Sequence, residues 1–304
     1  MGAWGIGLYS SDFAMDLRGS VKAIARLPFT PDRLLELLCA TEPAAANDLK
    51  DPDYSTFWLT LADQFAKRGI DCASARERAL GIITSGADLA AMAARGLDET
   101  SLLKRRAMLE DLRRRITVPI DTAKSRRVVL KAPQKLLMAV GEVLAYPICE
   151  GKPINPYAVG KEFAWVKAWK QDAWGSFVVA ERGLMFGYLA WYRPLVITEP
   201  LFDTPTLAEL SLPRMWLLRN PGTLNARHYA NLALKSLGCV SIDDNKFASA
   251  FPKRMSAMSC VVSDISLANS ISVRPRGSHD DNRIGLGYPP APRINALAEI
   301  AGVE

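Results

Sequence analysis

The chain has little of the chemistry on which most enzymes and metal sites depend. Among its 304 residues are two histidines, His228 and His279, and five cysteines that are far apart and form no C-x-x-C pair. The motifs G-x-S-x-G, H-E-x-x-H and Walker A are absent. We therefore predict no catalytic residue, no metal site and no cofactor. A hydrolase that uses His228 or His279 is kept as the third functional alternative.

Long apolar runs are also missing. No segment approaches the roughly 18 uninterrupted apolar residues that cross a membrane. The first residues lack the basic and then apolar layout of a secretion signal. An odd number of scattered cysteines is typical of a reducing compartment. These features together predict a cytoplasmic protein without a membrane partner.

The positive charge of the chain is concentrated in one stretch. The whole sequence has 38 Lys and Arg against 32 Asp and Glu, a net charge of +6. Between Lys104 and Lys135 there are 11 basic and 3 acidic residues, so the stretch has a charge of +8 and the rest of the chain −2. The length favours two domains, and this stretch lies where the sequence pattern changes from helical to strand-like.

Residues 1–116 are predicted to form an all-α domain. Thr30 and Pro31 have the pattern of an N-cap followed by proline at the first helical position, and Gly69 and Gly86 follow apolar helical patterns as stop residues. The start, MGAWGIGLYS, has two interpretations: a phosphate cradle at a helix N-terminus, or a packed N-terminal anchor, which we favour because the G-x-G-x-x-G spacing is lacking. Pro119 ends the last helix and opens a basic linker over 117–135.

The last helix of this domain, from Ser101, has an apolar face formed by leucines and Ile116, and Arg105 falls near its edge. The remaining cations suit either a solvated or protein-facing surface or a polyanion-binding surface. The candidate polyanion- or partner-binding residues are Lys104, Arg105, Arg106, Arg113, Arg114, Arg115, Arg126 and Arg127.

Residues 136–304 are predicted to form a β-rich α+β domain with a small twisted sheet or a partly open barrel. Short aromatic and β-branched segments predict strands at 141–148, 163–169, 174–180, 184–192 and 194–197. We also expect a helix from Arg227 to Leu237 that stops at Gly238, and a strand at 260–263. Residues 274–293, rich in Pro, Gly and Arg, are expected to be a loop or mobile tail. The predicted fold class is α+β.

The N-terminal part resembles an uncharacterised bacterial domain family. The resemblance starts with Trp4, Gly5, Gly7, Tyr9, Asp12, Ala14 and Asp16 in the pattern W-G-x-G-x-Y-x-x-D-x-A-x-D. Two further blocks, 51–69 and 79–89 with the Lys104-Arg-Arg triplet after it, extend it over residues 1–116. It implies a shared domain but no particular chemistry.

Within 141–197, the run GEVLAYP and the later strands resemble the small β domain of polymorphic-toxin immunity proteins, which implies a protein that neutralises a partner by binding it. We therefore predict a bacterial, non-enzymatic binding protein, an immunity or toxin-neutralising protein, with nucleic-acid binding through 104–135 as the alternative. Its partner would be a toxin or another macromolecule. The possible interface aromatics are Trp169, Trp174 and Trp191, with Tyr188 and Tyr192 beside them.

Overall fold

The structure is a computed structural model in which residues 5–118, 127–156, 169–262, 265–273 and 292–302 are described. The chain has two compact units, a helical unit that extends to Lys131 and a sheet unit that begins at Ala132. This boundary falls inside the stretch 117–135. The predicted α+β class is confirmed. Within the described ranges, no helix has the length and apolar character that a membrane crossing requires.

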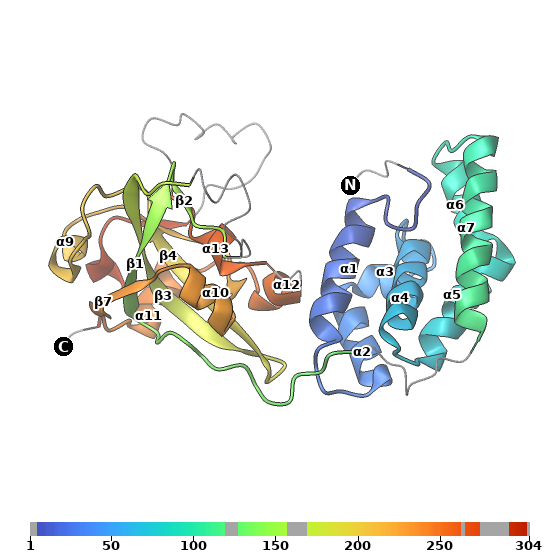
Figure 1. Ribbon diagram of the computed structural model, residues 1–304, viewed down its shortest axis with the longest axis horizontal. Coiled ribbons are helices and arrows are strands. Elements are labelled where there is room, and N and C mark those ends of the chain that lie inside the picture. The colour runs from blue at the N-terminus through green and yellow to red at the C-terminus, as the bar shows by residue number, and fades with distance from the viewer. Residues whose placement is uncertain (1–4, 119–126, 157–168, 263–264, 274–291, 303–304) are drawn as a thin grey trace. The chain divides into compact units, whose positions relative to one another are not determined.

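The helical unit is built around one central helix (Figure 1). Its helices are α1 (Asp12–Ile24), α2 (Pro31–Thr41), α3 (Pro43–Asn47), α4 (Tyr54–Arg68), α5 (Ala73–Ser85), α6 (Ala87–Ala94) and α7 (Glu99–Thr117). Every residue of α4 from Thr56 to Phe65 is buried, because α1, α3, α5 and α7 all pack against this helix. A helix that is buried all round needs its polar side chains paired, and α4 contains Asp63 and Gln64.

The helix ends follow the sequence pattern. Ser11 and Thr30 cap α1 and α2 by accepting hydrogen bonds from Ala14 N (3.1 Å) and Arg33 N (3.3 Å). Gly69 and Gly86 close α4 and α5 with φ of 68° and 70°, the left-handed conformation that only glycine adopts without strain. These capping residues therefore set where the helices begin and end.

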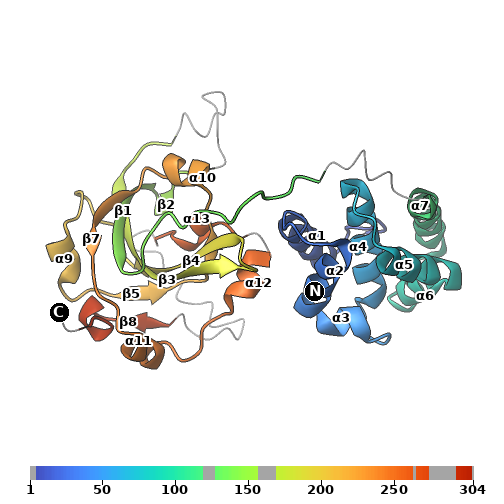
Figure 2. The same cartoon turned by 90° about the horizontal axis from the view of Figure 1, so that it is seen from below.

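The sheet unit contains an open antiparallel sheet, shown from a second side in Figure 2. Its strands follow the order β2-β1-β3-β4-β5-β8, with β6 on β4 and β7 on β1. The elements are β1 (Glu142–Cys149), β2 (Lys152–Pro153), β3 (Ala173–Met185), β4 (Leu189–Ile197), α9 (Leu207–Ser211), β5 (Trp216–Leu218), β6 (Gly222–Thr223), α10 (Ala226–Asn231), β7 (Lys235–Cys239), α11 (Asp244–Ala250), α12 (Ala257–Val262), α13 (Leu267–Ser270), β8 (Arg293–Ile294) and the 3₁₀ helix η3 (Leu297–Glu299).

The central strands are covered on both faces. In β3 the run from Phe177 to Ala180 is buried without interruption, and the inner part of β1 is buried in the same way. A strand exposed on one face would alternate between buried and exposed residues. Continuous burial therefore places the core of this unit on both sides of β1, β3 and β4.

Three predicted elements are wrong. The expected strand at 184–192 is divided by a turn, with Phe186 and Gly187 at φ of 53° and 74°, so its two halves belong to β3 and β4. The helix expected over 227–237 stops at Asn231, and Gly238 lies inside β7. The strand expected at 260–263 is replaced by the helix α12, which ends at Val262. Short apolar runs do not distinguish a strand from a buried helix.

The second half of the predicted strand 184–192 and the predicted strand 194–197 form one continuous strand, β4, which contains Pro194. A proline removes a ladder donor and normally lies at an edge or a bulge. Here Pro194 pairs with Val179 at the point where the β3–β4 register shifts, between Val179 and Glu181. The bulge accommodates the proline, and β4 continues through it. Most of the strand expected at 163–169, and most of the tail expected at 274–293, lie outside the described residues.

Candidate functional site

Arg105 is a structural residue of the helical unit. Its side chain is 2% exposed, and its guanidinium donates two hydrogen bonds of 2.9 Å to the carboxylate of Asp88 on α6. It also donates to the carbonyls of Ile6 (3.0 Å) and Gly7 (2.8 Å). A buried charge with these four bonds is not available to an external partner. The prediction that Arg105 belongs to the polyanion- or partner-binding set is therefore corrected.

The same contacts decide between the two interpretations of the glycine-rich start. A phosphate cradle would present backbone N–H groups, whereas Ile6 and Gly7 present carbonyl oxygens to Arg105. Ser10 N donates to Gly7 O (3.1 Å), and a Cβ on Gly7 would lie 2.8 Å from the Ser10 hydroxyl oxygen. The loop is thus a tight turn packed against α7, as the anchor interpretation expects.

This turn places Tyr9 against the buried carboxylate of Asp63 on α4. The Tyr9 hydroxyl donates to Asp63 and accepts a hydrogen bond from Gln64. The side chain of Asp63 is 0% exposed, and its two oxygens also pair with Lys67 Nζ (2.7 Å) and Arg115 (2.5 Å). Burial opposes ionisation of Asp63, but the hydrogen bonds from Lys67, Tyr9 and Arg115 outweigh it and hold the pKa of the carboxyl below its usual value. Burial, followed by the bond to Asp63, raises the pKa of Tyr9.

Two further cations lie at the same place. The guanidinium of Arg18, on α1, is 5.4 Å from the centre of the Tyr9 ring, and Lys67 Nζ is 5.1 Å from it. Arg68, next to Lys67, donates to the side-chain and backbone oxygens of Gln64. We call this group the Tyr9 cluster; it consists of Tyr9, Asp63, Arg18, Lys67, Arg68 and Arg115.

The outer face of α7 contains the exposed members of the predicted set. Lys104 and Arg106 are exposed and form no ion pair within the described residues. Arg113 pairs with Glu110 (3.5 Å) and Arg114 with Asp111, all at the surface and three residues apart. Pairs of this kind contribute little stability and exchange readily for other partners. We call Lys104, Arg106, Arg113 and Arg114 the α7 outer face.

The remaining two predicted cations have other positions. Arg127 donates to the carbonyls of Ala25 (2.8 Å), Leu27 and Phe29 (3.0 Å), which follow the C-terminus of α1. Its guanidinium therefore satisfies carbonyls of the C-cap of α1 and of the segment that follows it. Burial lowers the pKa of Arg127. Arg126 lies outside the described residues.

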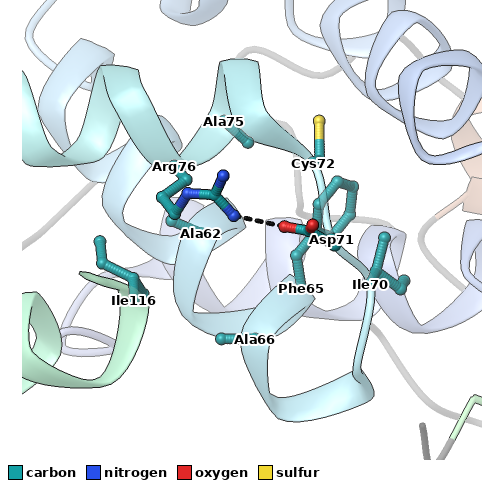
Figure 3. Close-up of a pocket in the computed structure, with 9 residues that line it drawn as sticks. All are labelled: Ala62, Phe65, Ala66, Ile70, Asp71, Cys72, Ala75, Arg76 and Ile116. Atoms are coloured by element: carbon teal, nitrogen blue, oxygen red, sulfur yellow. Dashed lines mark hydrogen bonds and ion pairs between the residues drawn. The ribbon is translucent and has the colours of Figure 1, made fainter. Parts of the chain in front are cut away.

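Two hollows are lined by described residues of the helical unit. A shallow groove of about 480 Å³ lies over α4 and α5, lined by Leu49, Tyr54, Arg78 and Ile82 among others, with no His or Cys among its lining residues. Arg78 donates to the Tyr54 hydroxyl (2.9 Å). The second, shown in Figure 3, holds only about 10 Å³ between Phe65, Cys72 and their neighbours, the space of a single water molecule. Neither hollow contains a nucleophile–base pair.

The predicted interface aromatics divide into partly buried and core residues. Trp174 lies under the ammonium of Lys235, 4.3 Å from the ring centre. Trp191 covers Gly183 on the neighbouring strand, where a Cβ would be 2.9 Å from its indole nitrogen. Trp169 is partly buried. Tyr192 is 0% exposed, and its hydroxyl accepts from Leu137 N (2.6 Å), so its predicted role at an interface is corrected to one in the core.

His228 and Asp243 each take part in a helix cap. Asn225 accepts from His228 N (2.9 Å) and lies 3.1 Å from its ring nitrogen, as a cap of α10. Asp243 caps α11 by accepting from Lys246 N (2.9 Å). His279 lies outside the described residues. In the described part of the chain, no group of three His, Cys, Asp or Glu has the geometry of a metal site.

Sequence reasoning missed the Tyr9 cluster, because its members come from four separate segments. The sequence pattern places Asp63 in a helix and Tyr9 in the glycine-rich start, and nothing in it indicates that the two residues meet. The available indication was a charged residue inside the apolar stretch of α4, since a buried carboxylate needs partners. Tyr9, Asp63 and Asp88 each lie in one of the three blocks on which the predicted resemblance to the bacterial family rests.

Comparisons of the chain with known protein families, curated proteins and solved structures found no match. The family resemblance of residues 1–116 and the immunity-protein resemblance of 141–197 stay predictions.

Proposed function

We propose that the chain is a non-enzymatic binding protein whose helical unit binds an acidic protein partner through the α7 outer face. The observation that supports this is the mixed character of that surface. Its exposed cations are interspersed with Glu110 and Asp111, and Leu103 is 57% exposed beside Lys104. Apolar and mixed-charge side chains together are typical of protein interfaces, where charge complementarity selects the partner.

Nucleic acid is the competing partner, and the same residues argue against it. A surface that follows a phosphate backbone gains affinity from each phosphate it neutralises. Glu110 and Asp111 lie among the exposed cations of this face and would repel a phosphate backbone, and Arg105 and Arg127 are occupied within the unit. Among the described cations of the predicted set, Lys104 and Arg106 are the two that form neither an ion pair nor a helix-capping contact. We favour a protein partner, in the role of an immunity or toxin-neutralising protein.

We also propose that the protein is cytoplasmic, because its described cysteines are free thiols. Cys39, Cys72, Cys149 and Cys239 are free thiols, and Cys239 is exposed. Exposed thiols persist in a reducing compartment.

The test is affinity capture with the full chain. The variant K104E/R106E/R113E/R114E is compared with K50E/R33E/K170E/K253E, which changes the net charge equally at exposed positions elsewhere. A captured protein is purified, and its affinity for the wild type and both variants is measured. We expect at least a tenfold loss for the α7 variant and less than a twofold change for the control. Equal loss in both variants would contradict a specific α7 interface.

Fluorescence anisotropy with labelled DNA and RNA over a salt series tests the competing partner. We expect weak binding that both variants reduce equally. Tight binding that falls steeply with salt and disappears only in the α7 variant would make nucleic acid the partner instead.

A further inference from the structure

The Tyr9 cluster brings more positive than negative charge to one place in the helical unit. Arg18, Lys67, Arg68 and Arg115 come from α1, α4 and α7, and Asp63 is the carboxylate that they surround. Tyr9 adds no negative charge, because its hydroxyl stays protonated while it donates to Asp63. The cluster therefore has a net charge of about +3 at neutral pH.

These cations repel one another where they lie. The pKa of Arg68 is lowered, chiefly by burial; Tyr9 and Asp63 raise it, whereas Arg18 lowers it, so this neighbouring cation makes the charged form of Arg68 less favourable. Lys67 and Arg115 pair with the two oxygens of one carboxyl group, at 2.7 and 2.5 Å, so their charges are held within about 7 Å of each other. Positive charge kept together in this way favours a bound anion.

Donors remain accessible for such an anion. The side chains of Lys67 and Arg115 are 50% and 46% exposed, and Arg18 is exposed on α1. A lysine ammonium has three N–H donors and a guanidinium has five, so the bonds to Asp63 leave several of them unused. Asp63 itself is 0% exposed and thus does not present its charge to an incoming ligand.

We propose that the Tyr9 cluster is a binding site for a phosphate group, held by Arg18, Lys67 and Arg115 beside the ring of Tyr9. A phosphate group has a charge of −1.5 to −2 at pH 7 and three strong acceptor oxygens, which matches the surplus charge and the donors better than a carboxylate does. The site goes beyond the proposed function, because it uses none of the α7 outer face and needs no macromolecular partner.

Isothermal titration calorimetry of the full chain in a low-chloride buffer tests the site, with inorganic phosphate and O-phosphoserine as separate titrants. The wild type is compared with R18Q/K67Q, which keeps the bonds from Tyr9 and Arg115 to Asp63, and with R33Q/K50Q as the charge-matched control. We expect saturable binding of one phosphate, weakened at least tenfold in R18Q/K67Q and unchanged in the control. Tighter binding of O-phosphoserine would point to a phosphorylated ligand, and tighter binding of inorganic phosphate to the free anion.

Absence of saturable binding to the wild type, or an equal loss in R33Q/K50Q, would overturn the proposal. Should circular dichroism show that R18Q/K67Q is unfolded, R18Q alone decides, since Arg18 lies over the face of the Tyr9 ring and forms no ion pair with the described residues; we then expect about a threefold loss. The α7 variant K104E/R106E/R113E/R114E should bind phosphate as the wild type does. Failure of the partner interface and failure of the phosphate site are thus separate results.

Discussion

At the scale of single residues, two buried carboxylates organise the polar interior of the helical unit. Asp88 and Asp63 are each 0% exposed, and each is paired with an arginine of α7, Arg105 or Arg115. Burying an ion costs several kcal/mol unless its partners restore the interactions lost with water. The position of α7 along the unit is therefore specified by charge as well as by the apolar contacts of Leu109 and Leu112.

Replacing Arg105 by Met should destabilise the protein by about 3–5 kcal/mol, because Asp88 would then be a buried charge without its main partner. Chemical unfolding followed by circular dichroism measures the change in the free energy of unfolding. The adjacent Arg106 is exposed, so Arg106→Met serves as the control and should change stability by about 0.5 kcal/mol or less. Similar losses in both variants would contradict a structural role specific to Arg105.

Asp63→Asn should reveal a stability contribution that depends on pH. The pKa of Asp63 is lower in the folded protein than in the unfolded chain, where it is about 3.9, so the unfolded chain binds the proton more readily. The contribution is thus fully present above this value and is lost as the pH falls through the folded-state pKa. Unfolding free energies of the wild type and variant should differ most at pH 5–7, and the difference should shrink as the pH falls below about 4. A difference that widens in acid would contradict the assignment.

At the scale of elements, some glycines allow two backbone segments to approach each other closely, and others have open space beside them. A Cβ on Gly222, in β6, would lie 2.5 Å from the backbone of Leu267 at the start of α13. Gly81, inside α5, has no atom within 4 Å of its hypothetical Cβ. The same substitution to alanine should therefore have opposite effects at the two positions.

Gly222→Ala should cost about 1–3 kcal/mol, because backbone atoms of β6 and α13 would have to move apart. Gly81→Ala should instead stabilise the protein by about 0.5–1 kcal/mol, since glycine is a poor residue in a helix interior. Thermal unfolding of both variants shows whether each substitution stabilises or destabilises the protein. A gain at Gly222 or a loss at Gly81 would contradict the packing described for that glycine.

The sequence predicted the elements whose causes are local. Caps such as Thr30 and stop residues such as Gly69 act within one turn, so α2 and α4 begin or end near the predicted places. The errors occur where contacts between residues that are far apart in the sequence determine the secondary structure. Gly238 has the pattern of a helix stop but pairs with Val143 in the sheet, and Pro194 has the pattern of a strand start but lies at a bulge. The Tyr9 cluster was out of reach for the same reason, because 54 residues separate Tyr9 from Asp63.

At the scale of the whole molecule, the buried ion pairs of the helical unit are all formed within residues 5–118. We expect the fragment 1–131 to fold by itself, because Arg105, Asp88, Asp63 and Arg115 keep their partners in it. Expressed alone, it should show a helical circular dichroism spectrum and one cooperative thermal transition. A spectrum without cooperative unfolding would mean that the helical unit depends on the rest of the chain.

The contact between Arg105 and the N-terminal turn also has a consequence for the order of events during synthesis. Gly7 is made before the arginine that binds its carbonyl, which follows 98 residues later. At about 5–20 residues per second, the ribosome needs about 5–20 s to reach it. During that interval the glycine-rich turn lacks the partner that fixes it, and the turn can take its final conformation only once the Arg105 part of α7 has been made.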